Sequence, residues 1–427
     1  MKKSAILPVL LTLVLCCPFK VYGQSNSNAK KPASGTYKRS AVLKVYRTSM
    51  KEKNYAKARQ AVEDAIRMHA DAAADPQLYR YDMDALNELI GTENRKIYLN
   101  TRPDTVGYFN YMYDLYTMGM KCDSVEQVRL QEKRALGKKA EPKLRAGVGQ
   151  LMLPYMNNLL NAGKYHYQKK NYTSAFRFFD MYATSKASEL LSTTKEAAAW
   201  ADNNTEVAVL AVLSAYASGN NAGTMAYLPA SLGDESLRAK LLEVGAKAAA
   251  ELHDEEAMLG LLEQGFDAYP NVEYFLMTLV KHYNDAERYG EALQRVQRMT
   301  QLYPNTRDYW YMAGKEQMLL GQYEAALASF ERCVEIKADD AESYSAIGNI
   351  YLHDAHEAYA HFNVPLSDPN YTTQKRTIDG LYKKACAAFE KARSFDEDNR
   401  ELWLSGLRET YFKLNKGREL RALEKRK

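Results

Sequence analysis

A spacing of 34 residues most constrains what this chain of 427 residues can fold into. Pro270, Pro304 and Ala338 stand one period apart, and similar patterns of apolar and small residues lie between them. Self-similarity at a period of 20–50 residues is typical of solenoids, in which each repeat stacks on the next. The sequence therefore predicts helical hairpins piled side by side, whose common role is to bind other molecules.

The clearest unit carries Trp310, Gly314, Tyr323, Ala326, Phe330 and Ala338 in that order. It resembles the tetratricopeptide repeat, whose skeleton is W-x2-L-G-x2-Y followed by A-x3-F and P. Gly314 and Ala326 are small where the two helices of a hairpin must approach closely, and Phe330 is large where hairpins meet. This resemblance implies an all-α, right-handed α-solenoid of stacked helical hairpins. The matching residues of the unit are Trp310, Ala313, Gly314, Gln317, Gly321, Tyr323, Ala326, Phe330, Cys333 and Ala338.

The repeat pattern divides the chain into regions of unequal match. Residues 155–427 fit the resemblance well, with an insertion at about 352–381 that lengthens both arms of one hairpin. Pro365 and Pro369 mark the turn of that elongated hairpin. Residues 37–154 form a divergent helical region with one repeat-like unit, at residues 53–65. Within it, residues 76–150 predict helices and nothing more specific.

The first 36 residues read as an export leader and a linker. Lys2 and Lys3 precede an apolar run from Ala5 to Cys17, which is the pattern of a signal peptide over residues 1–23. A bacterial lipoprotein is the alternative, but Leu15 stands where a small residue is expected before Cys16. Residues 24–36 are polar and predict a disordered linker. We therefore expect an exported protein, periplasmic or associated with the outer membrane, without a transmembrane segment.

Charge and cysteine content narrow the class of function further. The formal net charge of +5 includes three lysines of the leader, so it gives no reason to expect nucleic-acid binding. Three cysteines, Cys122, Cys333 and Cys386, lie outside the predicted leader. An odd number of cysteines in an exported chain does not make a complete disulfide framework. Cys333 and Cys386 fall in small-residue slots, which predicts buried free thiols.

A row of polar residues is the main candidate binding site. Lys247, Lys281 and Lys315 are 34 residues apart and Asn349 continues the series, next to the tight-packing slot of successive first helices. The resemblance implies that first helices line a concave face, and that Lys and Asn in related pockets hold a peptide carboxylate. We therefore expect a protein or peptide partner with an acidic or carboxylate-bearing segment. The alternative is that the slot needs only a soluble residue. Tyr274 and Tyr311, with Met277 and Met318, lie on the same helices and are candidate apolar contacts, although packing explains such residues equally well.

No catalytic motif and no cofactor motif emerges from the sequence. His353, His356 and His361 lie in the insertion, but His361 falls about 140° around the helix from His356, which argues against a metal site. An enzyme hidden within residues 76–150 lacks positive support. The sequence predicts a non-enzymatic protein–protein interaction scaffold outside the cytoplasm, without cofactor or metal. The alternative is an outer-surface glycan-binding accessory protein on helical repeats, and the oligomeric state stays open.

Overall fold

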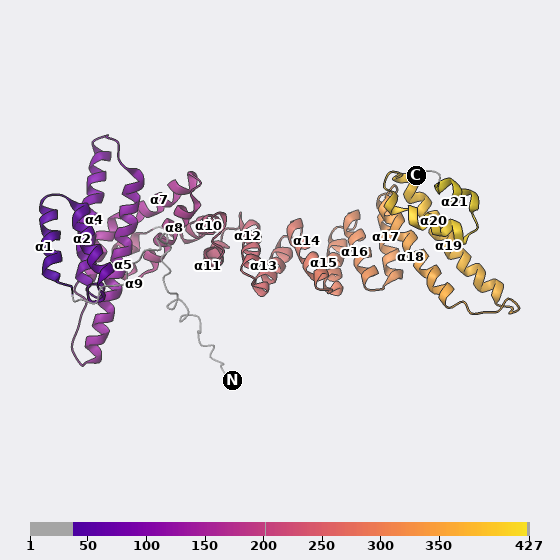
Figure 1. The fold of residues 1–427 in the computed structure, drawn as a ribbon, viewed down its shortest axis with the longest axis horizontal. Helices are drawn as coiled ribbons and strands as arrows, with labels where there is room; N and C mark the ends of the chain where they lie inside the picture. Colours follow the sequence, from indigo (N-terminus) through magenta and orange to yellow (C-terminus); the bar gives the residue numbers. More distant parts are fainter. Residues whose placement is uncertain (1–36, 201, 425–427) are drawn as a thin grey trace. The chain divides into compact units, whose positions relative to one another are not determined.

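The computed structural model describes residues 37–200 and 202–424, and these residues fall into two compact units. The predicted leader and the linker up to residue 36 lie outside the described residues. The first unit comprises residues 37–165 and 180–200, and the second comprises 166–179 and 202–424. No β-strand occurs within these ranges, which confirms the all-α prediction (Figure 1). No helix in them combines the length and apolar character needed to cross a lipid bilayer.

The first unit is built around two long antiparallel helices. α4 has 23 residues and α5 has 31, and shorter helices pack beside them. The helices from the start of the described chain to residue 192 are α1 (Arg39–Lys51), α2 (Tyr55–Met68), α3 (Ala70–Ala73), α4 (Pro76–Tyr98), α5 (Thr105–Ala135), α6 (Arg145–Met152), α7 (Met156–Gln168), α8 (Tyr172–Ala187) and α9 (Glu189–Ser192). Residues 53–65, where the sequence suggested a repeat-like unit, form the turn after α1 and most of α2, and helices occupy most of residues 76–150. The chain passes from one unit to the other within α7 and again within α8.

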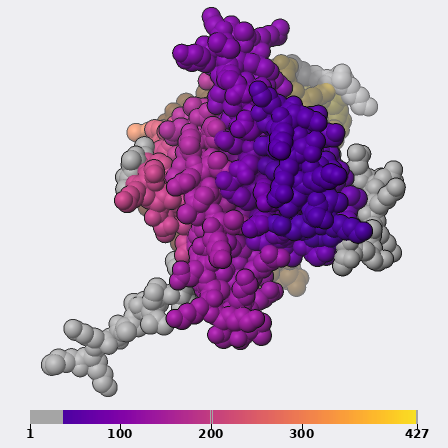
Figure 2. Space-filling model, turned by 90° about the vertical axis from the view of Figure 1, so that its left-hand side faces the viewer, coloured from indigo at the N-terminus to yellow at the C-terminus, as the bar shows by residue number. Residues whose placement is uncertain are grey.

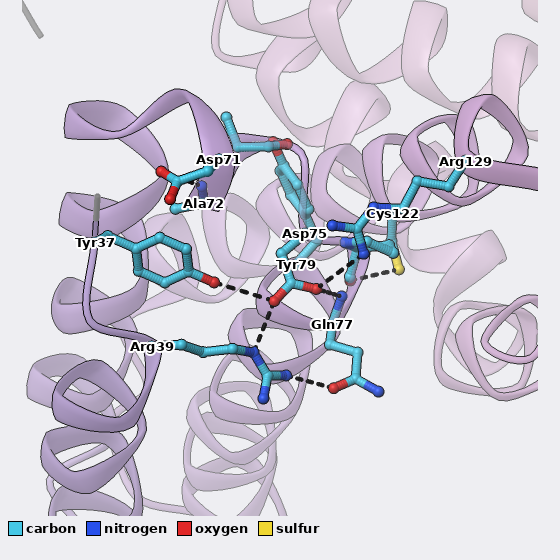
Figure 3. Close-up of polar contacts among 11 residues, drawn as sticks. Tyr37, Arg39, Asp71, Ala72, Asp75, Gln77, Tyr79, Cys122 and Arg129 are labelled. Carbon is cyan, nitrogen blue, oxygen red and sulfur yellow. Dashed lines mark hydrogen bonds and ion pairs between the residues drawn. The ribbon is translucent and has the colours of Figure 1, made fainter. Parts of the chain in front are cut away.

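Asp75 ties three parts of the first unit together (Figure 3). As the N-cap of α4 it accepts the backbone N–H of Gln77 at 3.2 Å. Its other oxygen accepts from the Arg39 Nε at 2.8 Å and from the Tyr37 hydroxyl at 3.2 Å. The Arg129 guanidinium of α5 lies 3.7 Å away. The first described residues are therefore fastened to the start of α4 by one carboxylate.

A second charged group lies deeper in the first unit. Asp82 is fully buried, and the Nε of Arg59 lies 3.4 Å from its carboxylate. Arg59 also pairs with Asp114 at 2.7 Å and with Glu63 at 2.8 Å. Burial raises the pKa of Asp82 to about 8, although Arg59 acts in the opposite direction. Three helices, α2, α4 and α5, thus contribute to one buried charge cluster.

The second unit contains a regular series of hairpins that follow one another in chain order (Figure 1). The first helices of the successive hairpins begin at Asn204, Arg238, Glu273, Arg307 and Ala341, in steps close to 34 residues. The helices are α10 (Asn204–Ala217), α11 (Asn221–Ser231), α12 (Arg238–Glu251), α13 (Glu255–Ala268), α14 (Glu273–Asp285), α15 (Tyr289–Leu302), α16 (Arg307–Leu319), α17 (Tyr323–Ile336), α18 (Ala341–Ala360), α19 (Tyr371–Phe395), α20 (Leu404–Lys413) and α21 (Gly417–Glu424).

The turn inside each of the first four hairpins, from α10–α11 to α16–α17, repeats with the same period. Gly219, His253, Glu287 and Gly321 all have positive φ, between 56° and 76°. At each of them the backbone N–H bonds back to the carbonyl three residues earlier, which ends the first helix in a left-handed cap. Two of the four are not glycine, so the left-handed conformation is imposed by the stacking as well as by local preference.

Close approach of glycine to phenylalanine joins the helices, as the sequence predicted. A Cβ added to Gly314 would lie 2.7 Å from the ring of Phe330, and one added to Gly348 would lie 2.9 Å from that of Phe389. Both rings are buried. Phe389 is also covered by Gly406 of α20, where an added Cβ would lie 2.6 Å from its Cδ2. Each buried phenylalanine ring therefore fits only because the position that faces it is a glycine.

The elongated hairpin near the C-terminus is confirmed. α18 has 20 residues and α19 has 25, whereas α16 and α17 have 13 and 14. The extra turns carry α18 about 10 Å beyond the length of α16 at 1.5 Å per residue. The loop between the two arms contains Pro365 and Pro369.

Candidate functional site

The first helices of the array present three rows of side chains, each with the 34-residue period. Side chains four residues apart lie on the same face of a helix, so the rows are one turn apart. We call these residues the first-helix face. The middle row is Lys247, Lys281, Lys315 and Asn349; the row one turn earlier is Glu243, Met277, Tyr311 and Ser345; the row one turn later is Glu251, Asp285, Leu319 and His353.

On α12 the lysine of the middle row is already neutralised within its own helix. Lys247 donates to Glu243 at 2.5 Å, and its ammonium lies 4.7 Å from the centre of the Tyr274 ring. Burial disfavours the charge on Glu243, but hydrogen bonds from Lys247 and Lys240 outweigh it and hold the pKa of the carboxyl below its usual value. Of the predicted site residues, Lys247 and Tyr274 are the two that the structure brings into contact.

On α14 the pattern is similar but more exposed. Lys281 pairs with Asp285 one turn later, and both side chains are more than half exposed. Such an exposed pair contributes little stability and can exchange partners readily. Met277, one turn before Lys281, is 44% exposed and adds an apolar contact surface.

On α16 the lysine has no carboxylate one turn away. Lys315 is exposed and forms no ion pair with the described residues. Tyr311 stands one turn before it, half-buried against Phe330, and Leu319 one turn after it, 52% exposed. The face of α16 therefore offers one cation between an aromatic and an aliphatic side chain.

On α18 the middle row ends in an amide. Asn349 is exposed, whereas Ser345 is buried with its hydroxyl directed to the carbonyl of Leu402. His353 stacks on Tyr323 with the ring centres 3.8 Å apart. The end of the first-helix face at α16 and α18 thus lacks the carboxylates that compensate the lysines of α12 and α14.

Buried polar pairs fix these helices beside one another, and the sequence did not reveal them. Asn284 of α14 donates to Glu316 of α16 at 2.9 Å, and burial raises the pKa of the Glu316 carboxyl. Arg307 at the start of α16 makes two hydrogen bonds of 2.6 Å to Asp340 and lies 4.3 Å over the Tyr311 ring. Tyr311 is therefore held from both sides, by Arg307 and by Phe330.

The three histidines of the elongated hairpin each have a different neighbour. His353 stacks on Tyr323, His356 lies 2.5 Å from Glu409, and His361 is highly exposed with Glu357 3.9 Å away. The described residues contain no group of three or more His, Cys, Asp or Glu side chains placed to hold a metal ion. Cys333 and Cys386 are buried free thiols, which confirms that prediction, and Cys122 is buried as well.

One repeat of this hairpin array matches a known family model. The tetratricopeptide repeat family model matches residues 308–340, which are α16, α17 and the turns around them. No curated protein matches the sequence. Among solved structures, a crystal structure of MamA is 17% identical, with a TM-score of 0.30 over 42% of this chain and 86% of that one. MamA from Desulfovibrio magneticus RS-1 is 13% identical, with a TM-score of 0.31 over 46% of this chain and 97% of that one. YrrB, titled a TPR protein with an unusual peptide-binding site, is 16% identical, with a TM-score of 0.32 over 49% and 93%.

The family match, the glycine–phenylalanine contacts and the left-handed turns all fall in one register. The same register extends from the hairpin of α10 and α11 to that of α18 and α19. Residues 308–340 therefore match a tetratricopeptide repeat, and this repeat lies within a longer array of helical hairpins.

Proposed function

We propose that the protein is a non-enzymatic scaffold that holds an extended segment of a protein partner along the first-helix face. The observation that carries this proposal is Lys315, an exposed cation without an ion pair among the described residues, set between Tyr311 and Leu319. An extended peptide with an acidic residue or a terminal carboxylate beside an apolar side chain fits this arrangement. The Lys315 ammonium supplies a charge-assisted hydrogen bond, and Tyr311 and Leu319 supply apolar area.

The compensation of charge along the face supports a proposal about where the acidic part of the bound segment lies. Lys247 and Lys281 each have a carboxylate one turn away, so an incoming anion would have to compete with Glu243 or Asp285. Lys315 and Asn349 meet no such competition within the rows. We therefore place the carboxylate of the partner at α16 and α18, and a less acidic part of the same segment at α12 and α14.

The site of action is a separate part of the proposal. We propose that the protein is exported and works outside the cytoplasm, on the strength of the leader pattern at residues 1–23. Cleavage after Gly23 would be checked by N-terminal sequencing of the protein purified from its native cells. Recovery of uncleaved protein from the cytoplasm alone would contradict export and leave the binding proposal untouched.

A pair of synthetic peptides tests the binding site. The probe is a fluorescent peptide that ends in leucine and glutamate with a free carboxylate, and its control is the same peptide with an amidated C-terminus. We expect the full chain to prefer the free carboxylate, and Lys315→Glu to weaken binding by about tenfold or more. Lys281→Glu should have a smaller effect, because Lys281 already pairs with Asp285.

Lys337→Glu is the matched control, since Lys337 is an exposed lysine directly after α17, the second helix of the same repeat. It should leave fluorescence polarisation binding curves unchanged. Equal binding by Lys315→Glu and the unaltered protein would remove Lys315 from the site. Equal loss in Lys315→Glu and Lys337→Glu would show that net charge, and not the first-helix face, determines binding.

A further inference from the structure

The far end of the α4–α5 hairpin exposes a run of large apolar side chains that no helix covers. Ile97 is 51% exposed, Tyr98 90% and Leu99 67%, and Val106 in the first turn of α5 is 46% exposed. Within residues 37–200 and 202–424 this is the one place where three consecutive large apolar residues are exposed. Exposed apolar clusters of this kind mark surfaces that are covered by something else in use.

The backbone of this end is well defined, so the apolar side chains are held outward. Asn100 adopts a left-handed conformation with φ of 54°, and the N–H of Thr101 bonds to the carbonyl of Lys96 at 2.8 Å, closing α4 with a capping turn. On the return, the N–H of Asp104 bonds to Glu93 at 2.9 Å. Figures 1 and 2 show this end, drawn in purple, standing clear of the other helices of its unit. We call residues 95–106 the apolar tip.

Acidic and basic side chains at the apolar tip differ in exposure and in pairing. The two nearest carboxylates have internal roles: Glu93, just before the tip, is buried and binds Lys96 at 2.6 Å, and Asp104 caps α5 by accepting from the N–H of Gly107. Arg95 and Arg102 are exposed, and neither forms an ion pair with the described residues. The tip therefore presents apolar groups together with two exposed guanidinium groups that have no ion pair among the described residues.

We propose that the apolar tip inserts into the head-group region of an anionic phospholipid bilayer. A convex end with outward aliphatic chains and a tyrosine has no cavity for a small ligand, but it matches the interface of a membrane. Tyrosine is favoured at the level of the head groups, aliphatic side chains reach the acyl boundary, and arginines beside them meet lipid phosphates. The charge complementarity favours this occupant over an apolar groove of another protein, which would leave Arg95 and Arg102 without counter-charges.

A position-specific fluorescence measurement tests this proposal with the full chain, so that any membrane affinity of residues 1–23 affects every variant equally. Tyr98→Trp places an indole at the tip, and the emission of the native Trp200, Trp310 and Trp403, measured in the unaltered protein with the same vesicles, is subtracted as background. Val128→Trp is the matched control, because Val128 is 52% exposed on the same helix α5 about 33 Å from Val106 along the axis. Vesicles of phosphatidylethanolamine and phosphatidylglycerol would carry bromine in the acyl chains as a contact quencher.

We expect bromine to quench the indole at position 98 and not the indole at position 128. Equal quenching at both positions, or none at position 98, overturns the proposal. An indole at position 98 that is already shielded before vesicles are added also overturns it, because a second copy or another part of the chain would then cover the tip.

Two further variants separate insertion from general attraction. Leu99→Asp in the Tyr98→Trp background should lower vesicle partitioning, as read by that indole, by about tenfold. Lys138→Glu with Lys139→Glu, both exposed at the opposite end of α5, should leave the quenching at position 98 unchanged. Far-ultraviolet circular dichroism confirms that each variant keeps its helices. Unchanged quenching in Leu99→Asp, or its loss in the lysine variant, contradicts insertion by the tip.

Discussion

Gly406→Ala should destabilise the C-terminal end of the array, although alanine is the better helix former. Phe389 is buried between two glycines, with Gly348 of α18 on one edge of the ring and Gly406 of α20 on the other. An added Cβ at position 406 would stand 2.6 Å from the ring Cδ2 and closer still to two further ring atoms. The Phe389 ring has no room to move away, because its other edge already packs so closely against α18 that a Cβ at position 348 would lie only 2.9 Å from it.

The size of the effect follows from two opposing contributions. Overpacking of a buried site costs about 1–3 kcal/mol of unfolding free energy. The gain in helix propensity offsets at most about 1 kcal/mol of this, and less in the first turn of α20. We therefore expect a net loss of about 1–2 kcal/mol. Gly380→Ala in α19 is the control, since nothing lies within 4 Å of a Cβ at that position, and it should be neutral or stabilising.

Hydrogen exchange measured peptide by peptide is the appropriate assay, because stability in a repeat array is local. Peptides from α18 to α20 should exchange faster in Gly406→Ala, while those from α12 to α15 should not change. Phe389→Leu removes the ring that the new Cβ would meet. Adding Gly406→Ala to Phe389→Leu should therefore have little further effect on exchange, so that the two substitutions are non-additive. Unchanged or slower exchange in Gly406→Ala would refute the packing argument.

Three other predictions follow from the buried charges and thiols. The Asp82 carboxyl has a pKa of about 8 in the folded state and its ordinary, lower pKa in the unfolded state, so the free energy of unfolding should fall as the pH rises between these two values. Asp82→Asn should remove this pH dependence and stabilise the protein by a few kcal/mol at pH 8, as measured by urea titration. Arg307→Ala leaves Asp340 buried without its arginine partner and should lower the free energy of unfolding by about 3–5 kcal/mol in the same urea titrations. Arg332→Ala is the control: Arg332 forms an exposed pair with Glu335, and its loss should cost about 0–1 kcal/mol. Burial raises the pKa of Cys333 to about 11 and that of Cys122 to about 12, so peptide-level alkylation at pH 8 should label neither until denaturant is added.

The packing slots of the array could be predicted from sequence because they combine a small and a large residue at a fixed spacing. Gly314 and Phe330 are such a pair, and their register carried the prediction of the neighbouring hairpins. Two of the left-handed turns gave no glycine signal, because His253 between α12 and α13 and Glu287 between α14 and α15 stand where glycine is usual. Stacking of the helices stabilises these strained turns, and a residue-type pattern does not show it.

The site was predictable in part. The lysine row came from the period, but its uneven compensation depends on carboxylates one turn away, Glu243 and Asp285, which the sequence contains at four-residue spacing. The cluster of Arg59, Asp82 and Asp114 had no such signal. Its members come from three helices separated by long stretches of chain, and no periodicity relates them.

Within this one chain the packing positions and the face positions behave differently from repeat to repeat. A glycine opposite a phenylalanine recurs in the hairpins of α16 and α18, because the helix separation there permits no Cβ. Along the array the three rows change from acidic and basic on α12 to aromatic, cationic and aliphatic on α16. A face substitution leaves the helix separation unaltered, so side chains such as Lys315 can be set by what they bind while Gly314 beside it is set by the stack. Because packing and surface chemistry depend on different, adjacent residues, a uniform fold can present a non-uniform surface.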